Sequence, residues 1–200
     1  MITVIDYGAG NLRSVENALA RINAPVRVVR DAETVRSAVK LILPGVGHFG
    51  QIAKALDELR LRDALLDRIA AGVPFLGICL GMQALYEGSD EAPDESGLSL
   101  LAGRISRFDA GLRVPHMGWN SVEITQHSRL FEGVEASPYF YFANSYYAPV
   151  GPDTVGTCTY GVPFSAVVEH RNAFGVQFHP EKSGAAGLRV LQNFVELEPC

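Results

Sequence analysis

The residue whose type and spacing most directly suggest chemistry is Cys79, which lies between two glycines in the segment GICLG. Residues Val73 to Gly77 before it are mostly apolar and typical of a buried strand, and Leu80 to Tyr86 after it are expected to form a helix. A nucleophile elbow has this arrangement, with glycines at a sharp turn and the reactive side chain at its apex. A helix start also lowers the pKa of a thiol, which is roughly 8.5 when unperturbed. We therefore interpret Cys79 as a nucleophile, although an average free cysteine is a small buried hydrophobe.

A thiolate nucleophile needs a base and a group that orients this base. Of the five histidines, His179 follows an apolar strand pattern over Phe174 to Phe178, so we expect it at a strand end, where ligand sites form in open α/β sheets. Glu181 stands two residues later and could turn back onto the imidazole. Cys79, His179 and Glu181 together predict a nucleophile, a base and an orienting carboxylate, although a surface turn with incidental charges also fits His-Pro-Glu.

Acyl transfer also requires N–H donors for a developing oxyanion. The N–H group of Leu80, directly after the nucleophile, is one candidate. The segment Pro44-Gly45-Val46-Gly47 follows another predicted strand, so Val46 or Gly47 could supply a second donor. From the sequence alone, a simple tight turn explains this segment equally well.

The elements that would position these residues alternate between strand and helix through the first half of the chain. Strand patterns cover residues 2–7, 25–29, 40–43 and 73–77, and helical patterns cover residues 12–23, 32–39, 52–59 and 61–71. This alternation predicts an α/β fold with a doubly wound, mostly parallel central sheet and flanking helices. Residues 88–98 are acidic and expected to be turn-rich, residues 103–178 are β-rich, and a last helix is expected over 185–196. We expect one domain over residues 1–200, because no linker or repeat divides the chain.

Composition excludes several classes of protein. The net charge of −5 and the lack of a basic block argue against a nucleic-acid partner. Residues 70–86 are uncharged, but they include three glycines and a proline and are shorter than the roughly 20 residues of a membrane span, so no membrane association is expected. The first residues lack the basic start of a secretory signal, and three dispersed cysteines form no disulfide or zinc pattern. A cytoplasmic location and no metal are therefore expected.

No cofactor is expected either. The turn Gly8-Ala9-Gly10-Asn11 resembles the start of a dinucleotide fingerprint, but Arg13 occupies the third glycine position.

Two motifs resemble those of the class I (triad) glutamine amidotransferases, namely GICLGMQ at 77–83 and HPEKS at 179–183. Within that family, four further stretches are similar to the glutaminase subunits of imidazole glycerol phosphate synthases: DYGAGNL at 6–12, LPGVG at 43–47, PHMGWN at 115–120 and YFANSY at 141–146. The likeness covers the whole chain in length and in motif order.

The resemblance implies an activity. Cys79 would attack the side-chain amide of L-glutamine, and His179, oriented by Glu181, would protonate the departing ammonia before water releases glutamate from the thioester. The ammonia would pass to a separate (β/α)8-barrel cyclase subunit, which forms imidazole glycerol phosphate in histidine biosynthesis. The resemblance further implies that the cyclase and its ligand switch the segment from Gly45 to Gly47 and so raise a low activity of the free subunit.

The resemblance also assigns roles to single residues. Matches to the family's glutamine contacts are Gly47, Gln83, Glu91, Ser145 and Tyr146, and candidates for the partner interface are Asn11, Trp119, Tyr141 and Lys182. A solvated loop charge is the commoner fate of a residue like Glu91, and a core role for Trp119 is as plausible as an interface role. Asn144 departs from the family, which usually has histidine there, and we assign it no function.

Three alternatives stay open at this stage. The chain could be another class I glutaminase, such as the subunit that feeds pyridoxal phosphate synthesis, although PHMGWN argues against it. It could be a non-catalytic binding module on the same fold, although Cys79, His179 and Glu181 are all present. A cysteine hydrolase of peptides or γ-glutamyl compounds is the third, and Gln83 and Glu91 would then lack their proposed ligand.

Overall fold

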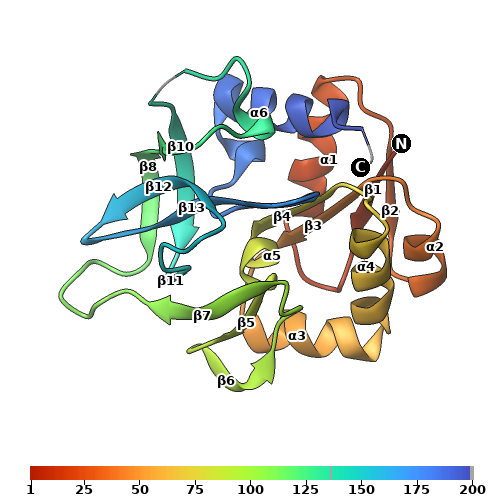
Figure 1. Ribbon diagram of the computed structural model, residues 1–200, viewed down its shortest axis with the longest axis horizontal. Coiled ribbons are helices and arrows are strands. Elements are labelled where there is room, and N and C mark those ends of the chain that lie inside the picture. Colours follow the sequence, from red (N-terminus) through yellow and green to blue (C-terminus); the bar gives the residue numbers. More distant parts are fainter. Residues whose placement is uncertain (136, 199–200) are drawn as a thin grey trace.

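The computed structural model describes residues 1–135 and 137–198 and is built around an eight-stranded sheet with the order β2-β1-β3-β4-β14-β13-β12-β9 (Figure 1). The strands from β2 to β14 in this order are parallel, and the remaining pairs are antiparallel. Their bounds are β1 (Ile2–Ile5), β2 (Val26–Val29), β3 (Leu41–Gly45), β4 (Phe75–Cys79), β9 (Glu123–Ile124), β12 (Thr154–Tyr160), β13 (Val162–His170) and β14 (Ala173–Val176).

Helices cover both faces of the parallel part (Figure 1). On one face lie α1 (Leu12–Arg21) and α6 (Gly184–Glu196), and on the other lie α2 (Ala32–Arg36), α3 (Phe49–Glu58) and α4 (Leu61–Ala70). Alternate residues of β3 serve the two cores, since Leu41 and Leu43 pack on the α3 side and Ile42 on the α1 side. The predicted doubly wound, mostly parallel sheet is thus confirmed. No helix among the described residues is long and apolar enough to cross a membrane.

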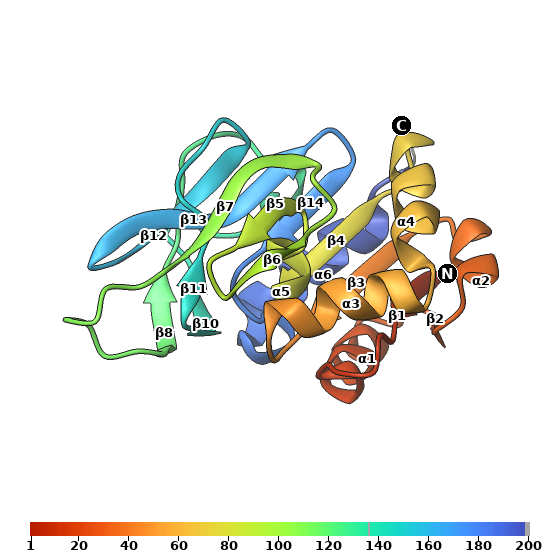
Figure 2. The ribbon, with the colours of Figure 1, turned by 90° about the horizontal axis from the view of Figure 1, so that it is seen from below.

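The β-rich additions form two smaller sheets. In one, β10 (Tyr139–Asn144) pairs with β8 (His116–Ser121), and in the other the order is β11 (Tyr146–Tyr147), β7 (Leu101–Arg107), β5 (Tyr86–Ser89) and β6 (Ala92–Ser96). Figure 2 shows the second sheet beside α3. The prediction that residues 88–98 form turns was wrong, because β6 lies there. Its side chains are largely solvent-exposed, so the segment has no apolar alternation to reveal a strand.

The helix after Cys79 is much shorter than the predicted span from Leu80 to Tyr86. It consists of α5 (Leu80–Gln83), and β5 begins at Tyr86. The carbonyl oxygens of Ala84 and Leu85 accept hydrogen bonds from the backbone of the following segment, at Leu98 and Leu101 respectively. Tertiary hydrogen bonds therefore replace those that would have continued the helix. The structure also contains two 3-10 turns, η1 (Arg129–Phe131) and η2 (Pro180–Lys182).

The strands β3, β4 and β14 are neighbours and parallel, so their carboxyl ends meet at one edge of the sheet. Ligand sites of open α/β sheets form at such an edge. Three predicted functional residues lie at these strand ends: Val46 directly follows β3, Cys79 is the last residue of β4, and His179 comes shortly after β14.

Candidate active site

The backbone at Cys79 has the predicted elbow, with the strain on the cysteine itself. Cys79 ends β4 with φ +53° and ψ −108°, a conformation that a residue with a side chain rarely adopts. Gly77 and Gly81 do not carry the positive φ. A Cβ atom on Gly81 would lie 1.8 Å from the Leu43 carbonyl oxygen, and one on Gly77 would lie 2.4 Å from the Gly81 oxygen. The glycines are therefore needed for close packing of β3, β4 and α5, and the interpretation that they supply the turn was wrong.

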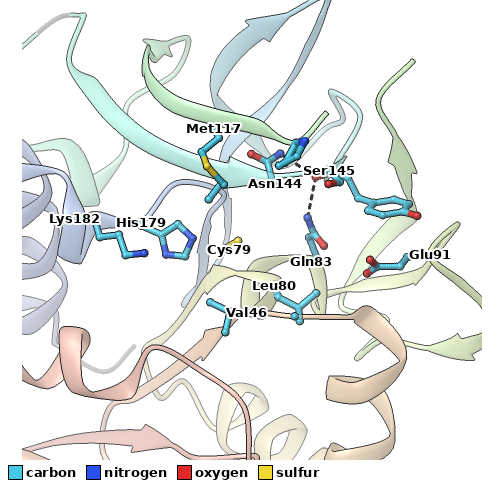
Figure 3. Close-up of a pocket in the computed structure, with 14 residues that line it drawn as sticks. Val46, Cys79, Leu80, Gln83, Glu91, Met117, Asn144, Ser145, His179 and Lys182 are labelled. Atoms are coloured by element: carbon cyan, nitrogen blue, oxygen red, sulfur yellow. Dashed lines mark hydrogen bonds between the residues drawn. The ribbon is translucent and has the colours of Figure 1, made fainter. Parts of the chain in front are cut away.

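The base and its orienting carboxylate meet as the sequence suggested. His179 Nδ1 and Glu181 Oε1 are 2.8 Å apart, and their side chains are only 3% and 1% exposed. Figure 3 shows the imidazole of His179 beside Cys79. Asn11, predicted at the partner interface, donates from its Nδ2 to the same Oε1 atom at 3.2 Å. The start of α1 thus holds Glu181 in place, a contact that the sequence did not reveal.

The charges at the site keep His179 protonated. Burial lowers the pKa of His179, but its charge interactions and hydrogen bonds with Cys79 and Glu181 outweigh burial and raise this pKa to about 10. An imidazolium next to the sulfur can neutralise a thiolate and later give a proton to a leaving group.

Cys79 and His179 open into a cavity of ≈ 330 Å³ (Figure 3). The cavity is lined by all residues predicted as oxyanion donors or glutamine contacts, namely Val46, Gly47, Leu80, Gln83, Glu91, Ser145 and Tyr146, and also by Lys182. Glu181 lies behind His179, outside the lining. The wall of the cavity also includes Pro115, Met117, Ala143 and Asn144, to which sequence reasoning gave no place in the site. Only the position of β8 and β10 over the sheet edge brings them there.

Tyr7 holds one of the predicted oxyanion donors away from Cys79. The Val46 N–H donates to the Tyr7 hydroxyl at 3.1 Å, and this hydroxyl donates to the Val46 carbonyl oxygen at 3.0 Å. Burial raises the pKa of Tyr7, so the hydroxyl keeps its proton. In this conformation the Leu80 N–H, at the start of α5, and the segment at Gly47 remain as candidate donors. Sequence reasoning gave Tyr7 no role, although the residue lies at the end of the predicted strand over 2–7 and in the motif DYGAGNL at 6–12.

Two predicted glutamine contacts are also held by the protein itself. Gln83 Nε2 donates to the Tyr146 carbonyl oxygen at 3.0 Å and to Gln177 Oε1 at 2.9 Å. Glu91 Oε2 accepts a hydrogen bond of 2.7 Å from the Phe49 N–H at the start of α3. These contacts fix both side chains at the cavity wall before any ligand binds.

Asn144 supports the same wall from β10. Its Nδ2 donates to the Tyr146 carbonyl oxygen at 2.9 Å, and across the β8–β10 pair it faces His116. His116 stacks on Phe142 and Tyr160, and its burial lowers the pKa of the imidazole to about 4, so His116 is neutral. Asn144 thus fixes the carbonyl group that also orients Gln83.

Three of the four candidate interface residues, Trp119, Tyr141 and Lys182, form a patch beside the cavity. Trp119 is 56% exposed, and its ring meets that of Tyr141 edge-on at a centroid distance of 6.3 Å. Lys182 Nζ lies 5.7 Å from the centroid of the Tyr141 ring. Met117 and Tyr139, which alternate with buried residues on β8 and β10, are exposed on the same face. The alternative of a core role for Trp119 was therefore wrong.

Within the described residues, no group of three or more histidine, cysteine or acidic side chains could hold a metal ion. Cys79 and Cys158 are buried and free, and Cys200 lies outside the described residues.

Comparison with known proteins agrees with this geometry. The family model for glutamine amidotransferase class-I matches residues 3–197. A solved structure described as a glutamine amidotransferase superimposes with a TM-score of 0.77 over 98% of both chains, at 22% sequence identity. The fold is that of a glutamine amidotransferase, and because the family model matches nearly the whole chain, the chain belongs to the class I glutamine amidotransferase family.

Among curated proteins, its relatives include subunits of one particular synthase. Imidazole glycerol phosphate synthase subunit HisH of Methanothermobacter thermautotrophicus is 50% identical over 98% of both chains. The subunit HisH of Deinococcus radiodurans is 47% identical over the whole of this chain and 95% of its own.

Proposed function

We propose that this protein hydrolyses L-glutamine to glutamate and ammonia and delivers the ammonia to the cyclase subunit of an imidazole glycerol phosphate synthase, in histidine biosynthesis. The observation that carries this proposal is that Cys79 and His179, with Glu181 behind the imidazole, meet at the wall of a cavity that suits an amino acid. The high identity to HisH subunits supports this particular synthase over other class I glutaminases.

In this proposal Cys79 and His179 each carry out a chemical step, and Glu181 orients His179. The Cys79 thiolate attacks the amide carbon of glutamine, forming the C–S bond of a tetrahedral intermediate. Because His179 Nδ1 contacts Glu181, its Nε2 is free to give the proton with which the amide nitrogen leaves as ammonia. The neutral imidazole then takes a proton from the water that attacks the thioester, and the C–S bond breaks to release glutamate and restore the thiolate.

The remaining wall residues bind and orient glutamine in this proposal. The N–H groups of Leu80 and Gly47 stabilise the oxyanion, and that of Val46 joins them once it leaves Tyr7. Glu91 is suited to the substrate's ammonium group, because it is the carboxylate among the cavity's polar residues. The other glutamine contacts are Gln83, Ser145 and Tyr146.

The partner would dock on the exposed patch of Trp119, Tyr141 and Lys182, with Asn11 nearby. Lys182 lines the cavity and also touches the patch, so the same residue reaches both the substrate side and the partner side. We propose that the partner is a (β/α)8-barrel cyclase and that the complex works in the cytoplasm as a heterodimer. Each chain would contribute one reaction, and this chain would act as one domain.

A reconstitution experiment tests the proposal. Cys79→Ser, combined with the cyclase subunit, should lose glutamine-dependent synthesis while ammonium salt still supports it. Loss of both activities would contradict the division of labour. A glutamine-analogue electrophile should label Cys79 in the wild-type complex, and a complex without this adduct would favour a non-catalytic module. The glutaminase rate of the free chain should be low and rise strongly with cyclase plus its ligand; equal rates would count against the switch.

A further inference from the structure

Gln177 is a buried residue next to the nucleophile that the mechanism above does not use. It follows β14, whose Val176 pairs with Ile78 of β4, so the next position along the two parallel strands brings Gln177 beside Cys79. Gln177 is fully buried, and its Nε2 lies 3.6 Å from Cys79 Sγ, within hydrogen-bond range for sulfur.

The surrounding hydrogen bonds determine which end of the Gln177 amide faces the sulfur. A backbone carbonyl only accepts, so the Tyr146 oxygen fixes the side-chain amide of Gln83 with Nε2 toward it. The second proton of this Nε2 points at Gln177, whose nearer atom must then be the acceptor Oε1, at 2.9 Å. The Nε2 of Gln177 is thereby left toward Cys79. Tyr146, Gln83 and Gln177 form a chain in which each orientation dictates the next.

We propose that Gln177 is a further catalytic residue, which donates an N–H hydrogen bond to Cys79 Sγ, and that Gln83 is the positioning residue that keeps this donor turned toward the sulfur. A donor at this place stabilises the negative sulfur more than the neutral thioester sulfur, because hydrogen bonds to charged groups are the stronger ones. It therefore favours the reactive thiolate before attack and its departure when water cleaves the thioester. The proposal rests on the proposed function only in taking Cys79 as the nucleophile.

Other charged or titratable groups also act on the sulfur. His179 and, behind it, Glu181 face Cys79 from the β14 side, Tyr7 lies near it on the β3 side, and Lys182 and Glu91 line the same cavity. All of these groups are retained in Gln177→Met, which adds no charge. The comparison of this variant with wild type therefore isolates the hydrogen bond.

Alkylation of Cys79 tests the proposal on the purified chain. The rate of iodoacetamide addition is followed from pH 5 to 10 by mass spectrometry of the peptide that contains Cys79. Gln177→Met keeps the length of the side chain without the donor, and we expect about tenfold slower alkylation at pH 7 and a profile displaced to higher pH. Gln177→Glu places a carboxylate there and should be slower still.

A buried amide far from the site provides the matched control. Asn193 on α6 donates to the carbonyl oxygens of Leu130 and Glu132, so Asn193→Leu also removes a buried side-chain donor. This variant should keep the wild-type alkylation profile. A Gln177→Met profile that coincides with wild type, or equal slowing by Asn193→Leu, would overturn the proposal.

Two further variants keep the test decisive. If Gln177→Met does not fold, Gln177→Glu and Gln83→Met test the proposal in its place. Gln83→Met frees the Gln177 amide to turn, so it should slow alkylation less than Gln177→Glu does. Wild-type alkylation rates in both variants would refute the role of Gln177. If the iodoacetamide rates follow the expected order but a glutamine-analogue electrophile fails to label Cys79 in the complex, the proposed function fails and the hydrogen bond stands.

Discussion

The substitution Tyr7→Phe would remove a single oxygen atom that holds the oxyanion segment in place. This hydroxyl donates to the Val46 carbonyl and accepts from the Val46 N–H, and the residue is only 4% exposed. The ring itself would remain in the core. The change therefore isolates the two hydrogen bonds from the packing of the aromatic side chain.

The structure allows the size of the effect to be estimated. Two neutral hydrogen bonds at about 1 kcal/mol each predict a loss of about 2 kcal/mol in the free energy of unfolding. For a chain of this length, this loss corresponds to a fall in Tm of roughly 4–8 °C. The same 2 kcal/mol favours the conformation in which the Val46 N–H is bonded to Tyr7 and turned away from Cys79. Without the hydroxyl, the fraction of molecules whose Val46 N–H can serve the oxyanion should rise by up to about 30-fold. An oxyanion donor contributes about 10²–10³ in kcat, so this gain should appear in turnover.

Two assays check this reasoning. Urea unfolding measures the loss of stability, and glutamine hydrolysis by the free chain should rise by up to about 30-fold in Tyr7→Phe. Tyr160→Phe is the control, because its hydroxyl donates to the Arg113 carbonyl outside the cavity, and it should leave hydrolysis unchanged. An unchanged or lower hydrolysis rate in Tyr7→Phe, together with the expected loss of stability, would refute the idea that Tyr7 restrains Val46.

Three further outcomes are expected. Gly81→Ala should destabilise the protein by about 3 kcal/mol or more in urea unfolding, because its Cβ would lie 1.8 Å from a β3 carbonyl oxygen, whereas Gly151→Ala, in open space, should be neutral. Because folding raises the pKa of His179 from 6.5 to about 10, protonation of this residue stabilises the folded state fully below pH 6.5, and this stabilisation is lost as the pH rises through 10. In urea unfolding, wild type should therefore lose more stability between pH 7 and 10 than His179→Asn. Parallel stability curves for the two proteins would contradict this. Trp119→Ala should weaken binding of the cyclase about 30-fold in calorimetry, while exposed Val162→Ala on β13 should not; equal affinities would remove Trp119 from the interface.

The parts of the site that follow strands could be predicted from the sequence. Apolar runs before Cys79 and His179 identify β4 and β14, and the carboxyl ends of parallel strands meet at one sheet edge. The pairing of His179 with Glu181 is local, since only Pro180 lies between them. Length and alternation likewise predicted the doubly wound sheet, because a strand buried on both faces has a recognisable composition.

The sequence was less informative where distant segments meet. The strand β6 was predicted as acidic turns. Its side chains are largely solvent-exposed, so its sequence has no apolar alternation to indicate a strand. The prediction also extended α5 beyond Gln83, because helix propensity does not register the hydrogen bonds from Leu98 and Leu101 that end it.

By itself, the sequence singled out Cys79, His179 and Glu181 as the candidate nucleophile, base and orienting carboxylate, and it predicted the class of fold, because each of these inferences depends on residue type and on short spacing along the chain. Only the tertiary structure decided how these groups are held. Asn11 reaches Glu181 across 170 positions, Tyr7 reaches Val46 across 39, and Gln177 reaches Cys79 across 98. Such contacts depend on strand order and register, which bring distant positions to the same sheet edge and which no local pattern encodes.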